Sequence, residues 1–197
     1  MAGYFEKVVA TDLSEKQLAL AARHPRIFYG AAPAGRSPLE DGSADLVTAA
    51  TAAHWFELDA FYAEVRRVLR PGGGIAVWCY GHERRLTPSL DPIVRRYDKE
   101  IVGPYWEPEI RYVREKYETL PFPFEEAAAP PFKLRLSWTL DELLGYFSSW
   151  SSTQKYLKER GENPVALIEP DLRAAWGDPQ RRKAIVWDIH LRAGRVL

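Results

Sequence analysis

We infer the fold from the stretch Val8-Val9-Ala10-Thr11-Asp12-Leu13-Ser14. Its apolar run is too short for a helix and predicts a buried strand over residues 7–11. Ser14, with Gln17 three residues later, predicts a capping box that begins a helix reaching about Arg23. Asp12 therefore lies between a strand and a helix, where neither element requires a carboxylate.

Two interpretations of Asp12 are open. In doubly wound α/β folds, a carboxylate at the tip of the second strand accepts hydrogen bonds from the ribose hydroxyls of a nucleotide cofactor. Alternatively, Asp12 is a turn residue, or a charge that suits the positive end of the following helix. The order of the later segments favours the first interpretation.

Those segments alternate between strands and helices. Short apolar runs predict strands over residues 26–29, 44–50 and 75–78, and apolar residues at helical spacing predict a helix over 58–70. Such alternation is typical of a parallel α/β sheet, in which ligands bind at the carboxyl ends of the strands. The loop over 51–56 is at such an end. It holds His54 and Trp55, of which Trp55 could equally be a core aromatic.

The glycine cluster Gly72-Gly73-Gly74 stands in the wrong order for a cofactor loop. A nucleotide-binding turn follows a strand and precedes a helix, whereas this cluster follows a helix and precedes a strand. We interpret it as the end of the helix. We therefore expect an α/β fold with a Rossmann-like doubly wound sheet, mostly parallel, that lacks its first strand and Gly-rich loop.

The second half of the chain predicts an insert and an antiparallel edge. Residues 81–131 are rich in proline and aromatics and suit a helical lid over a pocket, or a surface excursion with its own small core. Phe132–Trp138 and Ile185–Leu191 alternate as antiparallel strands do. We expect three parts: a partial cofactor-binding core over 1–80, the insert over 81–131, and the remaining strands and helices over 132–197.

Composition excludes several classes of protein. The 27 basic and 27 acidic residues cancel, so nucleic acid is not an expected partner. Cys79 is the only cysteine, which excludes an intrachain disulfide and a thiolate metal cluster, and no metal is expected. No signal sequence or membrane-length apolar run is seen, so we expect a soluble cytoplasmic protein with no membrane partner.

The order of several short motifs resembles the class I S-adenosylmethionine-dependent methyltransferases, and within them the trans-aconitate methyltransferase branch. The motifs are Val9 to Ser14, Leu39 to Thr48, Ala53-His54-Trp55-Phe56, Val68 to Gly73, Trp138-Thr139-Leu140-Asp141, Trp150-Ser151 and Leu191-Arg192. The resemblance covers nearly all of the chain. It implies S-adenosyl-L-methionine as the cofactor and a small-molecule methyl acceptor, with O-methylation of a carboxylic acid as one possibility.

The resemblance also implies roles for individual residues. Asp12 is expected to contact the cofactor ribose and Leu13 to pack on the adenine, with Ala32 at the adenine edge, where many members have an acidic residue, and Ala50 nearby. His54 is the expected catalytic residue. The expected substrate contacts are Trp55, Tyr80 and Trp150.

The same reasoning leaves other outcomes open. Since the Gly-rich loop is not seen, we expect this chain to bind the cofactor weakly and to be weakly active or inactive. A non-catalytic remnant of the fold is the main alternative, and a nicotinamide-dependent dehydrogenase fits poorly because no Gly-X-Gly-X-X-Gly is present. An unpaired central strand position would favour association, so a homo-oligomer is possible. His82, Arg84 and Arg85 are further candidates for orienting a carboxylate acceptor.

Overall fold

The computed structural model describes residues 1–196, except for the side chains of residues 82–85. The chain divides into two compact units. Unit 1 comprises Met1–Trp78, Leu120–Ala129 and the C-terminal residues from Leu191, and unit 2 comprises Cys79–Thr119 and Pro130–His190. Unit 1 thus includes two segments from later in the chain, and the expected division into three parts stays a prediction.

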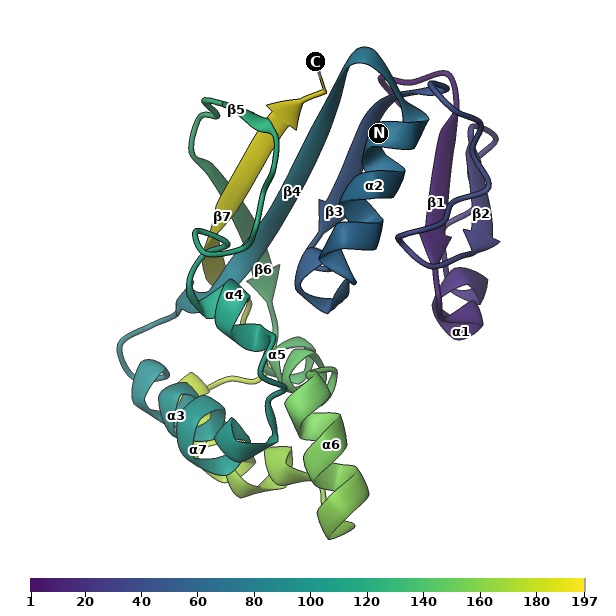
Figure 1. The fold of residues 1–197 in the computed structure, drawn as a ribbon. Helices are drawn as coiled ribbons and strands as arrows, with labels where there is room; N and C mark the ends of the chain where they lie inside the picture. The colour runs from purple at the N-terminus through teal and green to yellow at the C-terminus, as the bar shows by residue number, and fades with distance from the viewer. Residues whose placement is uncertain (197) are drawn as a thin grey trace. The chain divides into compact units, whose positions relative to one another are not determined.

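The strands of unit 1 are mostly parallel, as expected (Figure 1). The strands are β1 (Val8–Asp12), β2 (Ile27–Ala31), β3 (Ala44–Ala50), β5 (Glu125–Ala127), the first part of β4 (Leu69–Arg85) and the end of β7 (Lys183–Arg195). β1 pairs with β2 in parallel, with Asp12 opposite Ala31, and β3 pairs with β4 in parallel. The carboxyl ends of β1 and β2 therefore lie next to each other.

The strands belong to two separate sheets. β1 and β2 form a two-stranded sheet, whereas a five-stranded sheet has the order β3-β4-β7-β5, with β6 (Phe132–Trp138) also paired to β7. One edge of β1 and one edge of β3 thus have no partner strand in the part of the chain that the structure describes. The expected absence of a first strand stays a prediction.

Helix α1 (Glu15–Ala19) is shorter than the sequence predicts. Ser14 Oγ accepts a hydrogen bond from the backbone of Gln17 at 3.3 Å, but the Ser14 N–H donates to Asp12 Oδ1 at 2.7 Å. The expected capping box is therefore only half formed. The predicted extension to Arg23 is wrong because α1 buries none of its residues, and a short helix without tertiary packing is marginal.

Helix α2 (Leu58–Val68) buries the apolar face that its spacing predicts, including Phe61 and Val65. It ends at Val68, and β4 begins at once, so the strand predicted over 75–78 is longer in both directions. The glycine cluster lies within this strand. Gly72 has φ +76°, and its N–H donates to the Val196 carbonyl at 3.2 Å, which ties the start of β4 to the end of the chain.

Unit 2 contains helices packed against the second part of β4 and the first part of β7. Its elements are α3 (Asp91–Arg96), a π-helical turn η2 (Tyr97–Ile101), the 3₁₀ turns η3 (Gly103–Tyr105) and η4 (Pro164–Leu167), α4 (Ile110–Arg114), β6 (Phe132–Trp138), α5 (Leu140–Ser148), α6 (Ser151–Arg160) and α7 (Glu169–Trp176). Their shared core includes Leu143, Phe147, Leu172 and Trp187, each almost fully buried. The insert therefore has a core built jointly with later helices.

The last two predicted strands are present and antiparallel. β6 pairs with β7 (Lys183–Arg195), from Phe132 opposite Ile189 to Trp138 opposite Lys183. The capping box of α5 is complete, because the Thr139 N–H donates to Glu142 Oε2 at 2.7 Å and Thr139 Oγ1 accepts from the Glu142 N–H. None of the described helices is long and apolar enough to cross a membrane.

Helix α6 has no counterpart in the sequence prediction. Its polar composition, with only Ser152 and Thr153 buried, gives no apolar stripe to detect. A left-handed Gly161 at φ +74° ends it. The helix therefore depends on where it packs and not on its own hydrophobic pattern.

Candidate functional site

Asp12 lies at the carboxyl edge of the parallel pair β1–β2, as predicted. Its Oδ1 accepts the hydrogen bond from the Ser14 N–H, so the carboxylate also has the turn role of the alternative interpretation. Oδ2 has no partner among the residues that the structure describes. The side chain is exposed, and one carboxylate oxygen therefore faces solvent in a fixed orientation.

Leu13 and Ala32 lie beside Asp12. Leu13 is 76% exposed, which is unusual for a large apolar side chain next to a sheet edge. The Ala32 N–H donates to the Asp12 backbone carbonyl at 3.3 Å, so the residue after β2 is held against the residue at the end of β1. The structure thus brings together a carboxylate, an exposed apolar side chain and a small residue. A ribose with an attached flat base fits this set of chemical groups.

A buried carboxylate on α2 anchors the loop that follows Ala32. Glu64 is 9% exposed, and its Oε1 accepts hydrogen bonds from Ser37 N at 2.6 Å and Ser37 Oγ at 2.7 Å. Arg67 donates to Glu64 from Nε at 2.8 Å and to the Leu39 carbonyl at 2.8 Å, and pairs with Asp41 at 2.6 Å. We call these residues, Glu64, Arg67, Ser37, Leu39 and Asp41, the loop anchor.

The loop anchor perturbs the ionisation of Glu64. Hydrogen bonds from Arg67, and then from Ser37, lower the pKa of Glu64 from 4.5 to about 2 against the opposing effect of burial. The carboxylate is therefore charged at every physiological pH. Gly35 in the same loop approaches Ala60 of α2 so closely that a Cβ at residue 35 would lie 2.9 Å from the Ala60 Cβ. Sequence analysis missed this anchor, whose only signal was the i, i+3 spacing of Glu64 and Arg67.

The loop after β3 carries the predicted catalytic residue. Ala50 is the exposed last residue of the strand, His54 is 5% exposed on a short 3₁₀ turn (Ala53–Trp55), and Trp55 is 46% exposed. The His54 and Trp55 rings lie 4.8 Å apart between centroids. The two predicted residues are thus adjacent, with the imidazole inside and the indole outside.

Thr51, between Ala50 and this turn, has φ +50°. A β-branched residue in the left-handed region is an outlier, and such strain is frequent at functional sites. The Thr51 N–H donates to the Trp78 carbonyl of β4 at 2.7 Å, which holds the strained turn at the carboxyl end of the sheet. No sequence signal marks this residue, because threonine does not predict a positive φ.

Tyr80 and Trp150, the other two predicted substrate contacts, belong to unit 2. The Tyr80 ring packs edge-on against Trp187, and burial raises the pKa of its hydroxyl. Trp150 is 7% exposed and its ring lies 5.0 Å from Phe147 and 5.4 Å from Trp106. Both residues contribute to the aromatic packing of unit 2, and their contact with a substrate stays a prediction.

The other residues considered for the site are three carboxylate-orienting candidates, possible metal ligands and the single cysteine. The side chains of His82, Arg84 and Arg85 lie outside the described residues. Among the residues that are described, no group of three or more His, Cys, Asp or Glu side chains is placed to hold a metal ion. Cys79 is buried, which raises the pKa of its thiol to about 12 and leaves it protonated.

Known proteins resemble this chain in sequence and structure. A family model described as a methyltransferase domain matches residues 1–77. A Dictyostelium discoideum protein assigned as a methyltransferase is 32% identical over 179 residues, which are 89% of this chain and 68% of that protein. A methyltransferase-like protein of Schizosaccharomyces pombe is 29% identical over 174 residues, 86% of this chain and 65% of its own length. This chain thus spans about two thirds of the length of these curated relatives.

Solved structures also match this chain. A protein of Anaeromyxobacter dehalogenans, assigned as a type II methyltransferase, superposes with a TM-score of 0.86 at 44% sequence identity. The match covers 100% of this chain and 83% of that one.

Proposed function

This chain belongs to the class I S-adenosylmethionine-dependent methyltransferases, and we propose that its function is to methylate a small molecule, with a carboxylic acid as the acceptor. One observation carries the cofactor part of this proposal: the Asp12 carboxylate, oriented by Ser14 at the carboxyl edge of β1–β2, next to the exposed Leu13. The acceptor class rests on the resemblance to the trans-aconitate methyltransferase branch.

The residues at the β1–β2 edge suit the nucleoside part of the cofactor. Asp12 Oδ1 accepts the hydrogen bond from the Ser14 N–H, which leaves Oδ2 to accept one from a ribose hydroxyl. Leu13 offers an apolar face to the base. The loop anchor on Glu64 supports Ala32 and the backbone after it, which limits the movement of the adenine edge.

S-adenosylmethionine, when bound, supplies a methyl group on an already activated leaving group. The chain's own residues therefore need only to orient the acceptor and exclude water. We assign the orienting role to His54, which lies buried on the turn after β3, and a covering role to Trp55 beside it. A carboxylate acceptor is a competent nucleophile as it stands, so no general base is required.

We further propose that this 197-residue chain binds the cofactor weakly. The described residues hold their glycine cluster in β4, where it pairs with Val196, and not in a turn between a strand and a helix. One edge of β1 and one edge of β3 have no partner strand within the described part of the chain. These glycines therefore do not supply backbone N–H groups to bind the methionine part of the cofactor.

Saturation-transfer NMR with S-adenosylhomocysteine tests the cofactor site, because the method detects millimolar affinity. We expect signal transfer to the ribose and adenine protons of the ligand. Asp12→Asn should weaken binding roughly tenfold, since a charge-assisted hydrogen bond contributes about 1.5 kcal/mol or more. Glu15→Gln, an exposed carboxylate on the next helix, is the matched control and should bind like the wild type. Equal binding by the Asp12 variant would contradict the assignment.

Calorimetry and an activity assay separate the other parts of the proposal. Micromolar affinity for S-adenosylmethionine would refute weak binding and leave the assignment of Asp12 intact. Methyl transfer from labelled S-adenosylmethionine to a panel of small carboxylic acids would support the enzyme, with His54→Ala lowering turnover. Cofactor binding without transfer to any carboxylic, amine or thiol acceptor would favour the alternative, a non-catalytic remnant of the fold.

A further inference from the structure

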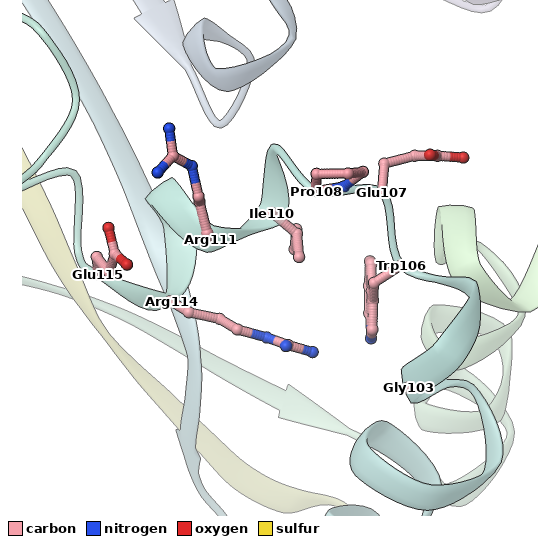
Figure 2. A pocket seen from close by; sticks show the side chains of 8 residues that line it. All are labelled: Gly103, Trp106, Glu107, Pro108, Ile110, Arg111, Arg114 and Glu115. Atoms are coloured by element: carbon pink, nitrogen blue, oxygen red, sulfur yellow. The ribbon is translucent and has the colours of Figure 1, made fainter.

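A second candidate site lies within unit 2. Figure 2 shows a pocket between the turn η3 and helix α4, with a volume of about 260 Å³. It is lined by an aromatic, two apolar, four charged side chains and a glycine: Trp106, Pro108, Ile110, Glu107, Arg111, Arg114, Glu115 and Gly103. All of these residues belong to one compact unit, so the pocket does not depend on how the two units are placed.

One side of the pocket is a rigid apolar surface. The Trp106 indole packs against Trp150 at 5.4 Å between ring centroids, and its Nε1–H donates to Asp98 Oδ1 at 3.0 Å. Ile110, 8% exposed, continues this surface from α4. Because the indole is fixed by both contacts, it presents its remaining surface to the pocket with little loss of side-chain entropy on binding.

Arg114 supplies a cation with unused hydrogen-bonding capacity. In Figure 2 its side chain extends across the pocket towards Trp106. The nearest carboxylate oxygen, Asp98 Oδ1, is 4.0 Å from its terminal nitrogen, which is beyond hydrogen-bond distance. A guanidinium carries five N–H donors, and among the described residues Arg114 donates none of them from its side chain.

The acidic side chains around the pocket are already engaged. Glu107 pairs with Lys155 at 2.7 Å, Glu115 accepts a hydrogen bond from Thr119, and the buried Asp98 accepts from Trp106. Because these carboxylates already have partners, they repel an anion bound to Arg114 less than unpaired carboxylates would. A ligand carboxylate is able to satisfy the guanidinium with two parallel hydrogen bonds.

The backbone around the pocket is irregular on both sides. Tyr97–Ile101 forms a π-helical turn before it, and Lys116 and Tyr117, directly after α4, both have positive φ, +59° and +62°. The Tyr117 N–H donates to the Tyr112 carbonyl at 2.7 Å, which closes the end of α4 tightly. π-helical turns and positive φ values are both more frequent at ligand sites than elsewhere. The hydrogen bond of Tyr117 fixes the end of α4, which carries Arg114.

We propose that this pocket binds a small carboxylate with an aromatic or apolar body. The carboxylate bonds to Arg114, and the body packs on Trp106 and Ile110. This inference goes beyond the proposed methyl transfer and does not rest on it, since the binding needs no S-adenosylmethionine. If cofactor binding fails while the carboxylate still binds, only the proposed function is refuted.

Fluorine NMR of 4-fluorobenzoate, titrated with the 197-residue chain in the absence of cofactor, tests the proposal. The expected result is saturable binding, with neutral 4-fluorobenzamide at least about tenfold weaker because it lacks the charge. Arg114→Gln should weaken benzoate binding by about tenfold or more. Circular dichroism of each variant establishes that it is folded.

Arg95 of α3 provides the matched control. It is an exposed arginine of the same unit and is not among the residues that line the pocket. Arg95→Gln should keep benzoate binding within about twofold. No saturable binding, equal losses in both arginine variants, or equal binding of the benzamide would overturn the proposal. Displacement of fluorobenzoate by inorganic phosphate at equal concentration would overturn the choice of a carboxylate.

Discussion

Replacing Glu64 with Gln removes the charge of the loop anchor while nearly preserving its shape. Gln keeps one oxygen that is able to accept from Ser37 but cannot form an ion pair with Arg67. In the wild type, Glu64 is 9% exposed and takes part in at least four hydrogen bonds to these two residues. The variant therefore isolates the electrostatic part of the anchor.

The magnitude follows from the pKa of Glu64. The carboxyl group has a pKa of about 2 in the folded chain against an ordinary value of 4.5. At neutral pH this difference corresponds to at most about 3 kcal/mol of stabilisation. Arg67 has 34% of its side chain exposed, so water screens part of the interaction and we expect a loss of about 2 kcal/mol. In a chain of this length, that loss lowers Tm by roughly 4–8 °C.

The pH dependence has a definite sign. Because the pKa of Glu64 is lower in the folded state, its charge stabilises the fold fully above about pH 4.5. The contribution is lost as pH falls from about 4.5 towards 2. The difference in the free energy of unfolding between wild type and Glu64→Gln should therefore be constant from pH 5.5 to 8 and fall to about half by pH 3.

Urea unfolding followed by far-UV circular dichroism measures this difference at each pH. Glu118→Gln, which changes an exposed carboxylate, should stay within about 0.5 kcal/mol of the wild type. Hydrogen exchange gives a local readout, because the Ser37 amide donates directly to Glu64 and should exchange faster in the variant. A loss below about 0.5 kcal/mol, or one that does not change between pH 7 and 3, would refute the reasoning.

Three further predictions concern single groups. Thr153→Val should lower the free energy of unfolding by about 1–2 kcal/mol, because the buried Tyr97 hydroxyl loses its hydrogen bond of 2.6 Å to Thr153 Oγ1. The double variant with Tyr97→Phe should lose less than the sum of the two single variants, and strict additivity in urea unfolding would contradict the pairing. Cys79 should resist iodoacetamide at pH 8 in the folded chain, since burial raises its pKa to about 12, and react in urea; mass spectrometry showing rapid labelling of the native chain would disprove this. Thr51→Gly should raise the free energy of unfolding by about 1 kcal/mol by relieving the positive φ, an expectation that fails if the variant melts at a lower temperature than the wild type.

Local chemistry made much of the fold predictable. β3 over Ala44–Ala50 and β6 over Phe132–Trp138 have the predicted bounds, because each is a short apolar or alternating run bordered by polar residues. The capping box at Thr139 is a local pattern of the same kind, since its two hydrogen bonds join residues only three positions apart. The position of Asp12 between a strand and a helix was predictable for the same reason, because a strand end and a helix start are both local patterns.

Other features depend on contacts between residues far apart in sequence. Ser37 and Glu64 are 27 positions apart, and neither residue alone indicates that a buried carboxylate holds the loop after β2. The helix α6 and the length of β4 depend on neighbouring elements, because neither has the hydrophobic pattern that would predict it. The positive φ of Thr51 is imposed by its hydrogen bond to β4, against the residue's own preference.

The sequence by itself therefore determined the family, the α/β class and the carboxylate at the end of β1, since each of these is encoded in the order of short motifs. Only the tertiary structure decided which aromatic side chains form the core of unit 2, and that Arg111 donates a hydrogen bond to the Tyr112 hydroxyl while the carboxylate beside Arg114, Asp98, lies 4.0 Å away. The physical reason is that the environment of a side chain is set by the elements packed around it. Two arginines on one short helix are equivalent in sequence but differ in the surfaces they meet.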